Sequence, residues 1–281
     1  MKIAVVQVIA ADEKSESGSL CKIWADLIRR NLNLVKHENT EFSFLFPRWG
    51  LTGHEAFFYS YLHHLNDKET FHSIVQAERE GFDAAMITCF YDPMLRDLRQ
   101  AVDIPVVSLG ESSMLMASMM GAKFGVVTIS PQAVYDFQDN IVKYGLVEKA
   151  VPVRPILETA EEQLVALTDV HHTIEAFKKV AKELIRDGAD VIIPGCGLMC
   201  PALRLAPGAE KEYPNGLTEV EGVPIMDALG VTLKMAETLV SLRQAGSCWI
   251  SRKAFYAQPT PKAIELSQMV LKYERPGFWH Y

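Results

Sequence analysis

Along most of this chain, short apolar runs rich in β-branched residues alternate with longer amphipathic stretches, beginning with KIAVVQVI at residues 2–9. Short runs of this kind predict buried strands, and the stretches between them predict helices. Regular alternation of the two is typical of parallel sheets with helices on their faces, so the pattern restricts the chain to the α/β class. The expected strands of the first series are residues 2–9, 41–46, 84–88 and 105–109, and its expected helices are residues 20–35, 70–80 and a short helix after Pro93.

The same cycle starts again in the second half of the chain. It begins with KFGVVTI at residues 123–129, which is similar to KIAVVQ at the start of the first strand. The further strands expected in this second series are residues 151–156, 190–194 and 224–226, and its expected helices are residues 131–144, 174–187 and 231–244.

Three residues of the first series recur at one fixed offset, because GFDAAMITC at 81–89 is matched by GADVIIPGC 107 positions later. Any two buried strands that follow a glycine-capped helix look somewhat alike, but a shared offset favours an internal duplication. We therefore expect two pseudosymmetric α/β halves with a cleft between them. The expected halves are residues 1–118, joined by the C-terminal helix and tail 228–281, and residues 119–227. The repeated residues are Gly81, Asp83 and Cys89 in the first copy and Gly188, Asp190 and Cys196 in the second.

The duplication puts one cysteine, Cys89 or Cys196, at the carboxyl end of a strand in each half. Ligands of open α/β sheets bind at those ends. A thiol there lies near the N–H groups that begin the next helix, whose partial positive charge favours the thiolate. Two such thiols across one cleft can act as opposed base and acid, one removing a proton from a carbon while the other protonates its opposite face. Such a stereoinversion needs no cofactor, and nearby loop N–H groups would stabilise the enolate.

Several segments around the two cysteines resemble one known family. ITCFYDP at 87–93, GAKFGVVTIS at 121–130 and DGADVIIPGCGLM at 187–199 are similar to motifs of the aspartate/glutamate/hydantoin racemase superfamily, and most similar to its hydantoin and allantoin racemase branch. The resemblance extends over roughly residues 1–242. It implies two α/β domains around a cleft, in which Cys89 and Cys196 are the catalytic acid and base.

The resemblance also implies which residues contact the substrate. Some follow the first strand of each half, namely Gln7 in the first half and Thr128 and Ser130 in the second. The others belong to the two cysteine loops and are Phe90, Tyr91 and Asp92 after Cys89, and Gly195, Gly197, Leu198 and Met199 around Cys196.

The predicted function is a cofactor-independent racemase or epimerase that inverts a carbon next to a carbonyl in a small hydantoin-, ureide- or amino-acid-like substrate. The chain departs from the branch after Gln7, where VIAAD at 8–12 stands in place of the usual Asn-Pro-Asn-Thr loop. Other activities of the same scaffold therefore stay open: a decarboxylase, a cis–trans isomerase or a hydrolase with a cysteine nucleophile. A two-lobed binding protein without catalysis is a further alternative.

Three other segments carry weaker signals. Residues 48–65 gather aromatic side chains and three histidines, which suit either a pocket wall or a subunit interface. The methionine-rich helix at 114–120 is expected in the core. The insertion at 201–222 and the tail at 246–281 are expected to extend the surface or an oligomer interface rather than to cover the cleft.

Composition excludes several classes of protein. The 28 basic residues are outnumbered by 35 acidic ones, so a nucleic-acid or anionic-membrane partner is not expected. No apolar run has the length of a membrane span or a signal peptide, and the five cysteines suit reduced thiols, so we expect a cytoplasmic protein. Nucleotide-binding glycine motifs are absent from the sequence. We expect a small-molecule substrate and a homo-oligomer, with no cofactor and no metal.

Overall fold

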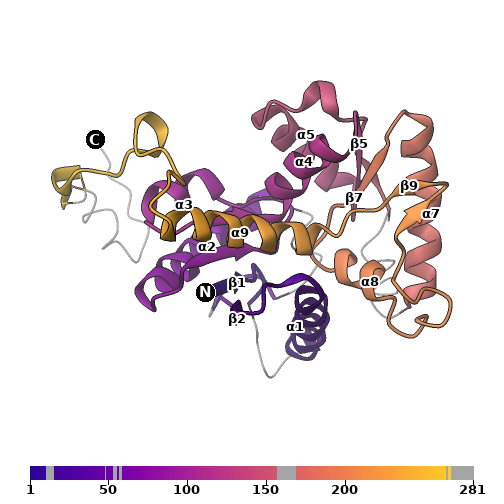
Figure 1. Cartoon of the computed structure of the whole chain (residues 1–281), viewed down its shortest axis with the longest axis horizontal. Helices are drawn as coiled ribbons and strands as arrows, with labels where there is room; N and C mark the ends of the chain where they lie inside the picture. The colour runs from indigo at the N-terminus through magenta and orange to yellow at the C-terminus, as the bar shows by residue number, and fades with distance from the viewer. Residues whose placement is uncertain are drawn as a thin grey trace, which may run out of the picture.

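The computed structural model is an α/β protein with two parallel sheets flanked by helices, which confirms the predicted fold class. It describes residues 1–10, 16–47, 49–52, 56, 59–156, 169–263 and 265–266. In Figure 1 the first half of the chain, indigo to purple, lies beside the second half, magenta to orange. No helix within the described ranges is both long and apolar enough to cross a membrane.

The first sheet has four parallel strands in the order β2-β1-β3-β4. Ile3 of β1 pairs with Phe42 of β2 on one side and with Ala84 of β3 on the other. Every residue of β3 and β4 is buried, as is typical of parallel strands covered on both faces. The strands are β1 (Lys2–Val6), β2 (Glu41–Leu45), β3 (Ala84–Ile87) and β4 (Val106–Ser108), and the helices are α1 (Glu16–Val35), α2 (Ser60–Arg79), α3 (Leu95–Ala101) and α4 (Leu109–Met120).

The second sheet has three parallel strands in the order β6-β5-β7. Its central strand β5 is buried along its whole length, and the amphipathic helix α7 packs against it through an apolar face. The elements are β5 (Phe124–Thr128), α5 (Pro131–Lys143), β6 (Arg154–Pro155), α7 (Val170–Arg186), β7 (Val191–Pro194), α8 (Met199–Leu205), β8 (Glu219–Val220), β9 (Val223–Pro224) and α9 (Ala228–Gln244).

The repeated aspartates make the same contacts in both halves. The Asp83 carboxylate accepts a hydrogen bond from the Lys2 N–H at 2.7 Å, and the Asp190 carboxylate accepts one from the Lys123 N–H at 3.0 Å. Each aspartate thereby ties the start of the cysteine-bearing strand to the first strand of its half. The sequence repeat therefore corresponds to a repeat in three dimensions.

Two expected strands differ from the prediction. The strand expected at 151–156 is reduced to β6, because Pro152 and Pro155 have no N–H to donate to a ladder. The strand expected at 224–226 becomes part of an antiparallel hairpin, β8–β9. Glu221 and Gly222 form its two-residue turn, both with left-handed φ, so the chain reverses there. Among the described residues, one parallel bridge, Ile192 with Ile225, continues the second sheet in that direction.

The sequence predicted that the methionine-rich helix at 114–120 lies in the core. In the structure only one side of this helix, α4, is buried. Met114 is buried, whereas Leu115, Met119 and Met120 are exposed. One side of α4 packs against α9 and the other side faces outward. Residues 201–222 also differ from a simple surface addition. Leu203 and Leu217 from this segment are buried in the core of the second half.

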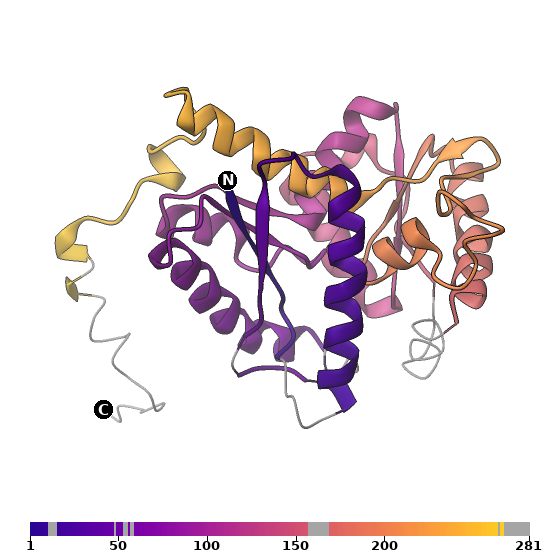
Figure 2. The same cartoon turned by 60° about the horizontal axis from the view of Figure 1, so that its bottom comes forward.

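Helix α9 returns from the second half and packs against α4, α1 and β3 of the first (Figure 1). Beyond it, Figure 2 shows the chain leaving the body of the molecule. The Arg252 guanidinium fixes this segment by donating to the carbonyl oxygens of Arg99 and Val102, both at 2.8 Å. The end of the predicted tail, residues 267–281, lies outside the described residues.

Candidate active site

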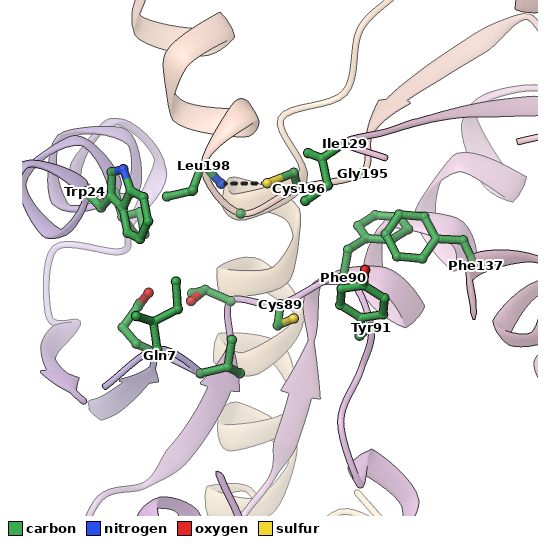
Figure 3. A pocket seen from close by; sticks show the side chains of 15 residues that line it. Gln7, Trp24, Cys89, Phe90, Tyr91, Ile129, Phe137, Gly195, Cys196 and Leu198 are labelled. Carbon is green, nitrogen blue, oxygen red and sulfur yellow. Dashed lines mark hydrogen bonds between the residues drawn. The ribbon is translucent and has the colours of Figure 1, made fainter. Parts of the chain in front are cut away.

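One cavity opens where the carboxyl ends of β1, β3, β5 and β7 converge between the two sheets. The space inside it, with the open solvent at its mouth included, is about 650 Å³. Figure 3 shows side chains from both halves around it. The wall consists of Gln7, Val8, Ile9, Trp24, Ile28, Thr88, Cys89, Phe90, Tyr91, Ile129, Phe137, Gly195, Cys196, Gly197 and Leu198.

The Cys89 thiol comes from the loop after β3 and is half-buried. Burial raises the pKa of this thiol well above its ordinary value, and the backbone N–H of Tyr91 only partly offsets the effect. The negative charges of Asp92 and of an ionised Cys196 raise this pKa further. These surroundings favour the neutral thiol form of Cys89.

The Cys196 thiol comes from the equivalent loop after β7 and is also half-buried. Burial raises its pKa, and the N–H groups of Met199 and Leu198 lower it. The Leu198 N–H lies 3.5 Å from the Cys196 sulfur (Figure 3). Within the part of the chain that the structure describes, no acidic side chain raises the pKa of this thiol, so Cys196 forms a thiolate more readily than Cys89.

The two cysteine loops approach each other closely at Gly197. A Cβ atom at this position would lie 2.1 Å from the backbone oxygen of Thr88, the residue before Cys89. No side chain fits there without moving one loop away from the other. Glycine at 197 therefore allows both thiols to line a single cavity.

Asp92 holds the Cys89 loop from behind rather than facing the cavity. Its buried carboxylate accepts hydrogen bonds from the N–H groups of Gly110 and Glu111 at 2.8 and 2.7 Å. The Tyr144 hydroxyl, from the second half, donates to the same carboxylate at 2.7 Å. Burial raises the pKa of Asp92 to about 6. These contacts hold Asp92 in a left-handed conformation with φ of 52°.

Gln7 and Thr128 occupy equivalent places at the end of the first strand of each half. Both are buried, and Gln7 Nε2 and Thr128 Oγ1 have no hydrogen-bond partner among the described residues. Gln7 lies on the cavity wall, whereas Thr128 does not. Such a buried amide without a partner is available to a ligand.

Some of the remaining predicted contact residues lie on the cavity wall, and the others lie behind it. Phe90 and Tyr91 lie on the wall, and the Phe90 ring packs at a tilt against that of Phe137, with 4.7 Å between the ring centroids. Ser130 caps helix α5 by accepting from the Ala133 N–H at 3.2 Å. Met199 packs into the core of the second half. Gly195, Gly197 and Leu198 are on the wall.

Sequence reasoning missed seven wall residues. Trp24 and Ile28 are one helical turn apart on α1 and so share a face, but an apolar face alone does not tell a cavity wall from a core contact. Thr88 and Ile129 adjoin predicted site residues, and their place next to strand ends was a signal that could have found them. The missed residues are Val8, Ile9, Trp24, Ile28, Thr88, Ile129 and Phe137.

No group of three or more metal-binding side chains occurs among the described residues. Cys200, four residues after Cys196, instead directs its thiol to the carbonyl oxygen of Pro194 at 3.2 Å. In the aromatic segment at 48–65, Trp49 and Tyr61 are exposed and none of the described residues lies on the wall. His54, Phe57 and Phe58 of this segment lie outside the described residues.

Comparison with known proteins identifies the family. The profile of the Asp/Glu/Hydantoin racemase family matches residues 50–236, which is most of the chain. The chain belongs to the Asp/Glu/hydantoin racemase family. Membership classes it with the racemases among the isomerases and confirms the resemblance seen in the sequence.

Individual relatives agree with this assignment. The hydantoin racemase of Pseudomonas sp. (strain NS671) is 31% identical over 197 residues, which cover 70% of this chain and 72% of the relative. The hydantoin racemase of Paenarthrobacter aurescens is 31% identical over 199 residues, covering 69% and 76%. The allantoin racemase from Klebsiella pneumoniae has the same fold, with a TM-score of 0.70 at 23% identity over 94% of this chain and 95% of that one.

Proposed function

We propose that this racemase inverts a carbon next to a carbonyl in a small hydantoin- or ureide-like substrate, without a cofactor, using Cys89 and Cys196 as opposed base and acid. The observation that carries the proposal is that two thiols from equivalent strand ends line one cavity. The names of the relatives, hydantoin racemase, support the substrate class.

The chemistry of the wall supports the two thiols as the proton-transferring groups. Among the wall residues that the structure describes, the only other ionisable group is the phenol of Tyr91. Burial raises the pKa of Tyr91 above its usual range, so this phenol stays neutral. The described wall therefore offers no carboxylate, imidazole or amine as a base, and the proposed mechanism assigns proton transfer to the two thiols.

The unequal pKa values of the two thiols indicate which of them acts first as the base in the proposed mechanism. Cys196, as the thiolate, removes the proton from the reacting carbon, and the electron pair moves onto the adjacent carbonyl oxygen. Cys89, as the thiol, then delivers its proton to the opposite face, and the carbonyl reforms. The protein is left with a Cys196 thiol and a Cys89 thiolate, which is the state required to convert the other enantiomer.

Gln7 supports an uncharged substrate. Its Nε2 has no partner among the described residues and is available to donate to a substrate carbonyl or to the enolate oxygen. The described wall contains no Lys, Arg or His that could pair with a free carboxylate. Within the predicted range of substrates, this favours a neutral ring or ureide over a free amino acid.

The test is inversion by the wild type and by two single variants, Cys89→Ser and Cys196→Ser. Each pure enantiomer of a 5-substituted hydantoin is incubated with protein, and optical rotation is followed. We expect the wild type to reach the racemic mixture and each variant to lose at least about a thousandfold in kcat, because a serine hydroxyl is a far weaker acid than a thiol. Cys248→Ser, at an exposed thiol, is the matched control.

Normal inversion by either single variant would refute the two-thiol mechanism. Failure of the wild type to invert any hydantoin or ureide would refute the proposed substrate class. The Cys248→Ser control separates both outcomes from a general effect of removing a thiol.

A further inference from the structure

Beyond helix α9 the chain continues beside helix α3 (Figure 1). This segment, residues 249–256, ends in a short 3₁₀ helix at Ala254–Tyr256 that packs against α3. The match to the family profile ends at residue 236, so the segment lies outside the part of the chain that identifies the family. We call residues 249–256 the C-terminal strap.

We infer that the C-terminal strap is a positioning element for Cys89, and that Arg252 and Tyr256 are its positioning residues. None of the strap residues lies on the described cavity wall. The strap acts instead through α3 and through an ion pair between Arg99 and Glu111. The inference rests on the proposed function, because it concerns the alignment of one of the two thiols to which proton transfer is assigned.

Arg252 fixes the C-terminal end of α3. Its guanidinium donates to the carbonyl oxygens of Arg99 and Val102, both at 2.8 Å, and to the Asp103 carboxylate at 2.7 Å. The last carbonyl groups of a helix have no partner within the helix, so these donors satisfy groups that α3 itself cannot. The guanidinium also lies 5.4 Å from the centre of the Trp249 ring, a cation–π distance that keeps it in place.

Tyr256 contacts the ion pair that joins α3 to α4. Arg99 of α3 donates to both carboxylate oxygens of Glu111, in the first turn of α4, and both side chains are largely buried. Burial lowers the pKa of Arg99, but hydrogen bonds with Glu111 and with the Tyr256 hydroxyl raise it, and the net shift is upward. A buried charge depends on such partners, so loss of the Tyr256 hydroxyl weakens the hold on Arg99.

The ion pair lies directly behind the loop that carries Cys89. The N–H of Glu111 donates to the Asp92 carboxylate at 2.7 Å. Arg99 Nε donates to a carbonyl oxygen of β4 at 2.9 Å, and the Ser108 hydroxyl at the end of β4 donates to the Cys89 carbonyl oxygen at 3.2 Å. The contacts of the ion pair therefore reach Cys89 both through Asp92 and through β4.

The Cys89 loop needs these supports because of its backbone conformation. Asp92 and Met94, on either side of Pro93, have left-handed φ values of 52° and 50°. Residues other than glycine adopt this conformation at a cost, and they keep it only where the surrounding contacts hold them. Leu95 begins α3 directly after Met94, so a shift of α3 away from α4 releases the loop. Cys89 would then move out of line with the reacting carbon and become more exposed to water.

The first test measures the alkylation rate of each cysteine in the full-length protein. Iodoacetamide reacts with the thiolate, so a thiol that becomes more exposed, with a less elevated pKa, is modified faster. We expect Arg252→Ala to raise the ratio of Cys89 to Cys196 modification rates about fivefold or more. The rate of the buried Cys21, in α1, should stay as in the wild type. Lys253→Ala, which removes an exposed positive charge from the same strap, is the control and should keep the wild-type ratio.

Activity gives a second readout. Arg252→Ala should lower kcat for the inversion of a hydantoin about tenfold in both directions and leave KM within about twofold, because a misplaced reacting group affects the transition state more than it affects substrate binding. Lys253→Ala should keep the wild-type kcat and KM.

A second variant keeps the test decisive if Arg252→Ala does not fold, which circular dichroism would show. Tyr256→Phe keeps the ring and removes only the hydroxyl that contacts Arg99. We expect the same changes on a smaller scale, with the ratio of Cys89 to Cys196 modification rates raised about threefold.

The two readouts separate this inference from the proposed function. If the alkylation ratio responds as expected and the wild type inverts no hydantoin, only the proposed function fails. The inference is overturned if folded Arg252→Ala and Tyr256→Phe proteins keep the wild-type ratio, or if a variant with an altered ratio inverts hydantoins at the wild-type kcat. It is also overturned if Cys21 and Cys196 are modified faster in the same proportion as Cys89, because that result would indicate a general loosening of the fold.

Discussion

Cys89 and Cys196 each follow a buried strand by two residues, and the same aspartate contact ties each strand to its neighbour. Their loops nevertheless differ. The loop after Cys89 passes through Asp92, a left-handed residue whose carboxylate binds the start of α4 and the Tyr144 hydroxyl. The loop after Cys196 leads directly into α8 and turns the Leu198 N–H toward the sulfur.

The difference shows how a duplicated fold can give two identical side chains unequal pKa values. Burial raises the pKa of both thiols, so position alone does not distinguish them. The carboxylate of Asp92 acts on Cys89 only, whereas the charges nearest Cys196 are partial positive charges on N–H groups. The duplication therefore accounts for the equivalent positions of Cys89 and Cys196, and the loop around each cysteine accounts for the difference between their pKa values.

The contact between the two loops is where a substitution should have the largest effect. Gly197→Ala would put a Cβ atom 2.1 Å from the Thr88 oxygen, and the loops would have to separate. We expect kcat/KM to fall about a hundredfold, because a displacement of about 1 Å between reacting groups costs that much. Gly121→Ala is the control: its Cβ would meet the Asp190 carboxylate at 2.2 Å, away from the cavity wall. Equal losses of activity per folded protein in both variants would contradict this prediction.

The pH profile tests the raised pKa of Cys196. In the proposed mechanism one direction of the reaction needs the Cys196 thiolate, and burial raises the pKa of this thiol above its ordinary value. The thiolate fraction, and with it kcat/KM, should therefore rise about tenfold per pH unit from about pH 6.5 to about pH 8.5. Steady-state rates with a hydantoin that does not itself titrate in this range would show the slope. A rate that is flat over the range would mean that Cys196 is already ionised at pH 6.5.

Alkylation measures the inequality between the thiols directly. Iodoacetamide reacts with thiolates, so Cys196 should be modified about tenfold faster than Cys89 at pH 8. Peptide mass spectrometry over time gives a rate for each cysteine, and the exposed Cys248 serves as the internal reference. Faster modification of Cys89 than of Cys196 would reverse the assignment of base and acid.

The smallest effect should come from loss of the hydrogen bond between Tyr144 and Asp92, because this contact holds only the loop that carries Cys89. Tyr144→Phe removes the donor to the buried Asp92 carboxylate and should lower the free energy of unfolding by about 1 kcal/mol. Urea unfolding monitored by circular dichroism gives the value. Tyr135→Phe on helix α5, which ends just before Tyr144, is the control, because the Tyr135 side chain is exposed. Equal stabilities for the two variants would mean that the Asp92 contact contributes little to holding the loop.

The parts of the fold that depend on local pattern were predictable. Alternating strands and helices and the repeat at 81–89 and 188–196 gave the α/β class and both cysteine positions. The hairpin of β8 and β9 was not predicted, because the apolar run at 224–226 has the same pattern in a parallel and in an antiparallel pair. The two consecutive left-handed residues at Glu221 and Gly222 decide between them.

The site was only partly predictable for a similar reason. Gln7, Tyr91 and Leu198, from the loops after strand ends, lie on the cavity wall. Their contact with substrate, which the resemblance implied, stays a prediction. Trp24 comes from a helix face whose partner depends on tertiary packing and not on local sequence. Asp92 belongs to a cysteine loop, yet its carboxylate turns to the N-terminus of α4, a contact 18 residues away in the sequence.

The most direct test of the account is the stereochemistry of hydrogen exchange in the two single variants. Each pure enantiomer of one hydantoin is incubated in heavy water with Cys89→Ser or Cys196→Ser, and deuterium at the reacting carbon is followed by mass spectrometry. The account predicts that each variant exchanges only one enantiomer, without inverting it, and that the two variants exchange opposite enantiomers. If both variants exchange the same enantiomer, or if either still inverts its substrate, the two thiols are not an opposed pair.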